Sequence, residues 1–126
     1  MTQRVGHLAS ISLDCPDTEL LATFYSDLLG LTEAFATPDR GVIALSGAGT
    51  MLTMMRVADH VPPSWPHGPQ HQQLHLDIAV QDLDSASASA VALGAIAADH
   101  QASPEQWRVM LDPAGHPFCL TAVRPD

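Results

Sequence analysis

The sequence predicts an α+β domain made of two similar modules, each consisting of a strand, a helix and three further strands. Alternating apolar positions, typical of half-buried strands, occur in residues 8–15 and again in 74–80. A stretch with apolar residues at helical spacing follows each of them and ends on a Leu-Gly pair. Three short apolar runs separated by Gly, Pro or Asp then complete each module.

The first module is expected over residues 8–57. Asp17 stands directly before the helical stretch, where its side chain can cap the first turn, and Gly30 can end the helix in a left-handed conformation. We therefore expect a helix over residues 18–29. The three strands after it are expected at 32–36, 42–45 and 51–57.

The second module is expected over residues 73–123, after a linker at 58–72. Four prolines, three histidines and a glycine exclude a continuous helix or a central strand from this linker. Asp82 or Asp84 can cap the second helix, which ends at Gly94. Further strands are expected at 95–98, 107–111 and 118–123, with a strong turn between the last two.

The two modules can be aligned directly. Placing residues 10–17 above residues 75–82 matches the apolar positions, and the two Leu-Gly pairs match after loss of one residue from the second helix. Such self-similarity indicates duplication. One module alone, a single sheet with one helix, is marginal for burying enough apolar surface. We therefore expect residues 1–126 to form a single domain, with a concave space between the two sheets.

Composition restricts the classes of partner. Hydrophobic residues make up 46% of the 126 residues, as in a packed globular protein. Fourteen acidic against five basic residues give a net charge of −9, which disfavours nucleic acid and anionic lipid surfaces. The chain holds no apolar run of the roughly 20 residues that span a bilayer. We expect a cytoplasmic protein that binds a small molecule.

The two cysteines, Cys15 and Cys119, are too few for a disulfide framework. They fit a reducing compartment, where buried thiols pack as small apolar side chains. A bridge between them stays open at this point.

Three motifs carry a resemblance to a known superfamily. The first is Asp17 followed by Phe24-Tyr25 and Leu29-Gly30, and the second is His75-Leu76-Asp77 followed by Asp82 and Leu93-Gly94. The third is Asp112-Pro113-Ala114-Gly115-His116-Pro117-Phe118. With these motifs the chain resembles the vicinal oxygen chelate (VOC) superfamily of glyoxalase I, bleomycin-resistance proteins and extradiol dioxygenases, and most of all its glyoxalase-like proteins. The resemblance covers nearly the whole chain. It implies two tandem βαβββ modules forming a curved mixed sheet around a central cleft, and a homodimer.

The resemblance also assigns four metal-ligand positions, which fall here on Ser10, Thr53, His75 and Cys119. Ser10 replaces the usual His and Cys119 replaces the usual Glu, so only His75 is retained. A neutral hydroxyl does not substitute for an imidazole or a carboxylate. We therefore expect no metal and no other cofactor.

A different metal site remains an alternative. His75 and Cys119 are both acceptable zinc ligands, and Asp77 or Asp14 could add an oxygen from the same face. In the other interpretation, His75 is a hydrogen-bonding residue of the pocket and Cys119 packs as an apolar group. We adopt the second interpretation.

The linker residues are interpreted as structural. His67, His71 and His75 are spaced by four, but the prolines and glycine among them exclude a helix that would bring them together. We expect His60, His67 and His71 to be solvated. Trp65 is either a lid over the pocket or an anchor for the long loop.

Strand alternation, anchored by the resemblance, predicts which side chains line the cleft. The set combines an adaptable apolar lining with a few polar anchors, as is usual for a small-molecule site. Its members are Ser10, Ser12, Asp14, Thr53, Met55, His75, Asp77, Arg108, Met110 and Cys119. Asp77 lies in an otherwise apolar strand and should be paired, with Arg108 or His75 as the candidate partner.

The predicted function is that of a metal-independent glyoxalase-like protein that binds a small organic ligand. One alternative is an isomerase, epimerase or lyase in which the catalytic pair is His75, as the group that moves a proton, and Asp77, which orients it. The other is a metal-dependent lyase or dioxygenase with an atypical site.

Overall fold

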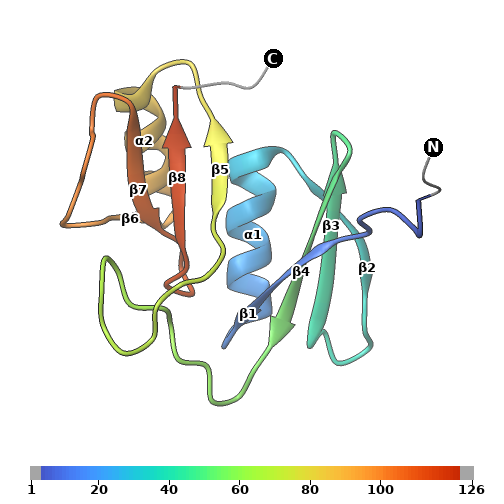
Figure 1. The fold of residues 1–126 in the computed structure, drawn as a ribbon. Helices are drawn as coiled ribbons and strands as arrows, with labels where there is room; N and C mark the ends of the chain where they lie inside the picture. Colours follow the sequence, from blue (N-terminus) through green and yellow to red (C-terminus); the bar gives the residue numbers. More distant parts are fainter. Residues whose placement is uncertain (1–3, 123–126) are drawn as a thin grey trace. The chain divides into compact units, whose positions relative to one another are not determined.

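The computed structural model describes residues 4–122 and divides into two compact units, with the boundary after Ala58. Each unit contains one four-stranded mixed sheet and one helix, in the order strand, helix and three strands (Figure 1). This confirms the predicted α+β class with two tandem βαβββ modules. Among the described residues, neither helix is long and apolar enough to cross a membrane.

The first unit holds a sheet of strand order β1-β4-β3-β2. β1 and β4 are parallel, whereas the other neighbours are antiparallel. The elements are β1 (Ile11–Cys15), α1 (Thr18–Leu29), β2 (Thr32–Ala36), β3 (Val42–Gly47) and β4 (Thr50–Arg56). The expected helix and the expected strand at 32–36 agree with the structure residue by residue.

The second unit repeats this arrangement with the order β5-β8-β7-β6 and a parallel pair β5 and β8. The elements are β5 (Leu76–Ala79), α2 (Leu83–Leu93), β6 (Ile96–Ala97), β7 (Trp107–Leu111) and β8 (Pro117–Thr121). Residue 123, where we expected the last strand and the second module to end, lies outside the described residues. So do the two ends of the expected domain 1–126.

Both helices begin at the aspartates that the two motifs share. The Asp17 carboxylate accepts a hydrogen bond from the backbone N–H of Leu20 at 3.0 Å, and Asp82 accepts one from Ser85 at 3.0 Å. Of the two candidates for the second cap, Asp82 is therefore the capping residue. Gly30, with φ of 70°, ends α1 in the left-handed conformation expected of it.

Each sheet buries one face against its own helix. In the first unit, Phe24 and Tyr25 of α1 are almost fully buried, and their rings meet edge to face with centroids 4.9 Å apart. They pack with the inward side chains Leu21, Ile43, Leu45, Leu52 and Met54. In the second unit, Ala90 of α2 is buried, as are Met110, Phe118 and Leu120 of the sheet. The opposite face of each sheet does not pack on that helix.

The turn between β7 and β8 is fixed by one buried carboxylate. Asp112 is 3% exposed, and its Oδ1 accepts hydrogen bonds from the backbone N–H groups of Ala114 (2.9 Å) and His116 (3.0 Å). Gly115 adopts φ of 90°, and a Cβ atom there would lie 2.5 Å from the Cβ of Pro62. A glycine is therefore required by both the backbone conformation and the close approach.

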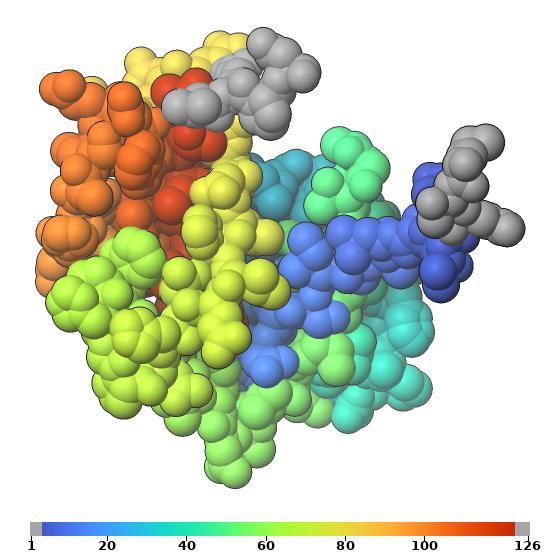
Figure 2. Space-filling model, in the orientation of Figure 1, coloured from blue at the N-terminus to red at the C-terminus, as the bar shows by residue number. Residues whose placement is uncertain are grey.

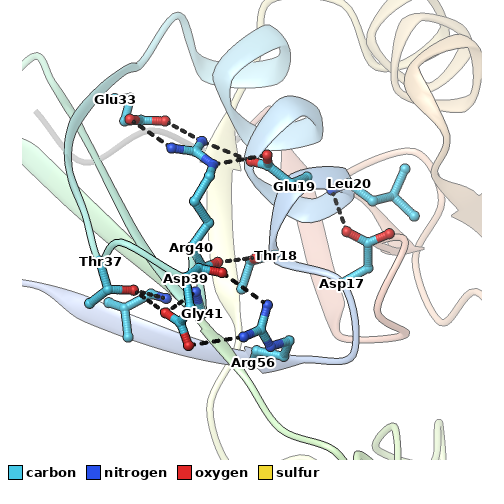
Figure 3. A network of polar contacts seen from close by, with 11 residues as sticks. Asp17, Thr18, Glu19, Leu20, Glu33, Thr37, Asp39, Arg40, Gly41 and Arg56 are labelled. Carbon is cyan, nitrogen blue, oxygen red and sulfur yellow. Dashed lines mark hydrogen bonds and ion pairs between the residues drawn. The ribbon is translucent and has the colours of Figure 1, made fainter.

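A polar network connects the start of α1 to the turn between β2 and β3 (Figure 3). The Arg40 guanidinium binds the carboxylates of Glu19 at 2.8 Å and Glu33 at 2.7 Å. These hydrogen bonds lower the pKa of both carboxyl groups and raise the pKa of Arg40. The Thr18 hydroxyl donates to the carbonyl oxygen of Arg40 at 2.7 Å. The cluster is structural, because its charges are paired with one another.

Replacing Thr18 with Val should lower the free energy of unfolding by about 1–3 kcal/mol, because the part-buried hydrogen bond from Thr18 to the Arg40 carbonyl is lost. Thr18 is 2% exposed, and valine keeps its shape. Arg40→Gln is the matched variant and should cost less, because exposed ion pairs contribute little. Urea unfolding of the three proteins measures both losses. A larger loss in Arg40→Gln would mean that the ion pairs, and not Thr18, hold this turn.

Candidate functional site

The face of the second sheet opposite α2 carries two rows of side chains. Residues directly opposite on neighbouring strands point to the same face of a sheet. One row, across β5, β8 and β7, is Asp77, Cys119 and Val109; the next is Ala79, Thr121 and Trp107. Polar and apolar groups therefore stand side by side on one surface.

These six residues line a cavity of about 710 Å³ together with Trp65 and His75. We call it the second-unit cavity. Its volume lies within the roughly 300–1,000 Å³ usual for small-molecule sites. Trp65 belongs to the segment before β5, which runs below the second sheet and past the lower end of β8 in Figures 1 and 2. Trp65 thus forms a wall of this cavity, and the chain's other tryptophan, Trp107, forms another.

The polar end of the cavity consists of three side chains. His75 Nε2 lies 3.3 Å from Asp77 Oδ1, so His75, and not Arg108, is the partner of Asp77. One donor atom each from His75, Asp77 and Cys119 lies within 4.8 Å of the others. Burial raises the pKa of the half-buried Cys119 thiol to about 11, and the charge of Asp77 and its hydrogen bond add to the effect. The thiol is therefore neutral at physiological pH. No disulfide bridge joins Cys15 and Cys119.

The segment from Asp59 onwards packs on the second unit. His60 Nε2 lies 3.0 Å from the carbonyl oxygen of Ala114, to which it donates, and the His60 ring lies 5.4 Å from that of His116. The expectation that His60 is solvated was therefore wrong. His67 and His71 are exposed, as expected.

Two predicted site residues lie on the other face of the sheet. Arg108 binds Asp84 of α2 at 2.8 Å, and Met110, which is 1% exposed, pairs with Phe118 in the core. The prediction that they line the site was wrong, because the alternation assigned to β7 was shifted by one residue. Trp107 and Val109 line the cavity in place of Arg108 and Met110.

The turn after β7 fixes how the residues of β7 and β8 pair, and so gives the correct alternation for β7. Asp112 N–H donates to the His116 carbonyl at 2.9 Å, and Leu111 lies opposite Pro117. Counting back along both strands from this closed turn pairs Cys119 with Val109. A prediction that started from the turn would have placed Val109 and Trp107 beside Cys119.

The remaining predicted residues belong to the first unit. Ser12 lies opposite Thr53, and Asp14 lies opposite Met55, on the face away from the buried Leu52 and Met54. This agrees with the predicted alternation. Ser10 also lines a cavity of about 490 Å³ at one end of this sheet, and the described residues that line it have no ionisable side chain. The prediction that both modules line one cleft stays a prediction.

The four positions that the resemblance assigns to metal ligands do not form a suitable donor set. The hydroxyl groups of Ser10 and Thr53 lie 2.6 Å apart and hydrogen-bond to each other. Two neutral hydroxyls that already satisfy one another are poor ligands for a divalent ion.

Three solved structures show the same fold. The fosfomycin resistance protein FosX from Mesorhizobium loti matches with a TM-score of 0.72 at 13% identity, covering 96% of this chain and 94% of that one. A mutant of FosX from Listeria monocytogenes, complexed with Mn(II) and 1S,2S-dihydroxypropylphosphonic acid, matches with 0.70 at 17%, covering 96% and 93%. A lactoylglutathione lyase from Agrobacterium tumefaciens matches with 0.61 at 17%, covering 94% and 95%.

A search of curated protein sequences found no match. The family model of the glyoxalase-like domain, in contrast, matches residues 10–121. This span contains both βαβββ units and the second-unit cavity. The chain therefore belongs to the glyoxalase-like domain family, within the VOC superfamily.

Proposed function

We propose that this protein binds a small amphipathic organic ligand in the second-unit cavity, without needing a metal ion. The observation that carries the proposal is the lining, in which His75, Asp77 and Cys119 form one polar end beside the side chains of Trp65 and Trp107. A few polar groups within an aromatic and aliphatic surface are the usual composition of such sites, because the apolar part supplies affinity and the polar part supplies orientation.

Charge narrows the class of ligand. Among residues 4–122, no arginine lines the cavity, and the chain has no lysine. Arg108 lies between the lining residues Trp107 and Val109 in the sequence, but its guanidinium binds Asp84 on the opposite face of the sheet. The phosphonic acid in the FosX complex is an anion, and a lining that has the Asp77 carboxylate and no arginine in its described part suits it poorly. We therefore favour a ligand with a neutral or cationic polar group at Asp77.

The two tryptophans favour a flat apolar part on the ligand. Indole rings offer large rigid surfaces for stacking and attract organic cations through their π faces. The indole nitrogen of Trp65 is shielded from solvent and has no hydrogen-bond acceptor among residues 4–122. A buried donor without a partner costs about 1–3 kcal/mol, which a ligand acceptor or a water molecule would recover.

Because both tryptophans of the chain line the cavity, intrinsic fluorescence reports directly on its occupancy. A thermal-shift screen of metabolites and aromatic amines supplies the ligand, since binding to the folded state raises the melting temperature. We expect the hits to shift or quench the emission equally with and without EDTA. Asp77→Asn should weaken binding of a cationic hit about tenfold or more, with little change in unfolding free energy.

Leu120→Ala is the matched control for this titration. Leu120 is the neighbour of Cys119 on β8, is 1% exposed and faces the helix. The substitution should cost about 2–5 kcal/mol of stability and leave the affinity of the folded protein unchanged. If Asp77→Asn destabilises the protein while the affinity stays the same, Asp77 is a structural residue and the site assignment fails.

A second function is favoured by the contact between His75 and Asp77. An imidazole held at 3.3 Å by a carboxylate is an arrangement that can accept a proton from a bound ligand and return it. Asp77 orients the ring and stabilises the imidazolium that forms. An isomerisation, epimerisation or elimination begins with such a step.

Proton transfer can be tested with a ligand from the screen that carries an acidic C–H group. In D₂O the protein should exchange that hydrogen for deuterium, which NMR detects as loss of the proton signal. His75→Gln should abolish the exchange while fluorescence still reports binding, because glutamine cannot act as the base. Exchange that continues at the same rate in His75→Gln would exclude this role.

Cys119 is not expected to act as a nucleophile, because its pKa of about 11 keeps it protonated. Alkylation of Cys119 by iodoacetamide, followed by peptide mass spectrometry, should be slow at neutral pH and rise towards pH 11. Asp77→Asn should lower the pKa only in part, because burial, the larger cause, remains. The raised pKa stabilises the fold below pH 9.0, and this contribution is lost as the pH rises through about 11. Rapid alkylation at pH 7 would contradict this assignment.

The expected homodimer and the cytoplasmic location stay predictions. Identities of 13% to the fosfomycin resistance protein and 17% to the lactoylglutathione lyase show a shared fold alone, and not a shared activity.

A further inference from the structure

We propose that His75, Asp77 and Cys119 form a binding site for a zinc-like divalent ion, built entirely within the second unit. The three side chains offer one imidazole nitrogen, one carboxylate oxygen and one sulfur, all within 4.8 Å of one another. This set differs from the four positions of the superfamily resemblance, because it uses Asp77 and needs neither Ser10 nor Thr53.

The distances fit the coordination sphere of zinc after small side-chain rotations. Zinc lies about 2.0–2.3 Å from its ligands, so two ligand atoms of a tetrahedral site are roughly 3.3–3.8 Å apart. The His75 and Asp77 atoms are already 3.3 Å apart. Their side chains are 37% and 62% exposed, so they can turn towards Cys119 without disturbing the core.

The backbone holds the three residues in one place. Asp77 lies directly opposite Cys119 on the parallel strands β5 and β8, and His75 precedes β5 by one residue on the same face as Asp77. The backbone positions are therefore set by the sheet, and only side-chain torsions must adjust. Three protein ligands with one open side leave a fourth position for water or a ligand atom.

The donor types select the ion. A thiolate and an imidazole favour zinc and other borderline or soft ions over Mg²⁺ or Ca²⁺, which prefer oxygen ligands only. On binding, the Cys119 S–H bond breaks, its proton passes to solvent, and the sulfur bonds to the ion with no change of oxidation state. An ion there would occupy the polar end of the second-unit cavity. It would then compete with an organic ligand, a consequence that rests on the proposed function.

The test uses the full chain, stripped with EDTA and dialysed, and Zn²⁺ alone as titrant in calorimetry. We expect one ion per chain. Co²⁺, as a spectroscopic substitute, should produce an absorption band from charge transfer between thiolate and metal. Cys119→Ser should abolish that band. Both Cys119→Ser and His75→Gln should weaken zinc binding by at least about tenfold, because the loss even of a residue that only supports a metal ligand weakens metal binding by about that factor.

His71→Gln is the matched control, because His71 is an exposed histidine of the same unit outside the cluster. It should bind zinc as the unchanged protein does, and circular dichroism in EDTA should show that all variants are folded. The proposal is overturned if the unchanged protein binds no zinc, or if Cys119→Ser keeps the affinity and the cobalt band. Binding of the organic ligand is measured separately, in EDTA. A failure to bind zinc therefore leaves the proposed function intact, and a failure to bind the organic ligand leaves the zinc site intact.

Discussion

The candidate site depends on the turn that the buried Asp112 carboxylate closes. By accepting hydrogen bonds from Ala114 and His116, this carboxylate fixes which residue of β7 lies opposite each residue of β8. Side chains alternate between the two faces of a strand, so a shift of one residue would exchange every side chain of one face for those of the other. The pairing of Cys119 with Val109, and with it the composition of the cavity wall, follows from this turn.

The fold could be predicted in detail because its signals are local. Asp17 and Gly30 mark the ends of α1 through capping and a positive φ, both of which act within one helical turn. The site could be predicted only in part. The strand β5 has one apolar face, Leu76 and Ile78, so His75 and Asp77 were placed on the correct face. In β7 apolar residues occupy both faces, so composition alone could not set the alternation, and Arg108 and Met110 were misplaced.

Duplication has given two sheets with the same geometry and different chemistry. Ser12 lies opposite Thr53 in the first unit at the position that Asp77 and Cys119 share in the second. In the first unit, Thr53 and Ser10 satisfy each other through a hydrogen bond of 2.6 Å, and neither group is ionisable near neutral pH. In the second unit, the equivalent face combines a carboxylate, an imidazole and a thiol. These three groups together are suited to proton transfer or metal binding, whereas the paired hydroxyls of Ser10 and Thr53 are not.

Asp77 is the residue on which the alternative functions of this face converge. Its negative charge favours a cationic group on a ligand and lies beside the imidazole of His75, and it adds to the effect of burial that raises the pKa of Cys119. These effects oppose one another in part, because a protonated His75 or a bound divalent ion would neutralise the charge that attracts an organic cation. A cation bound at Asp77 therefore weakens the attraction of this carboxylate for a second cation. The proposals for this cavity therefore differ in which cation, an imidazolium, a metal ion or an organic cation, occupies the space beside this carboxylate.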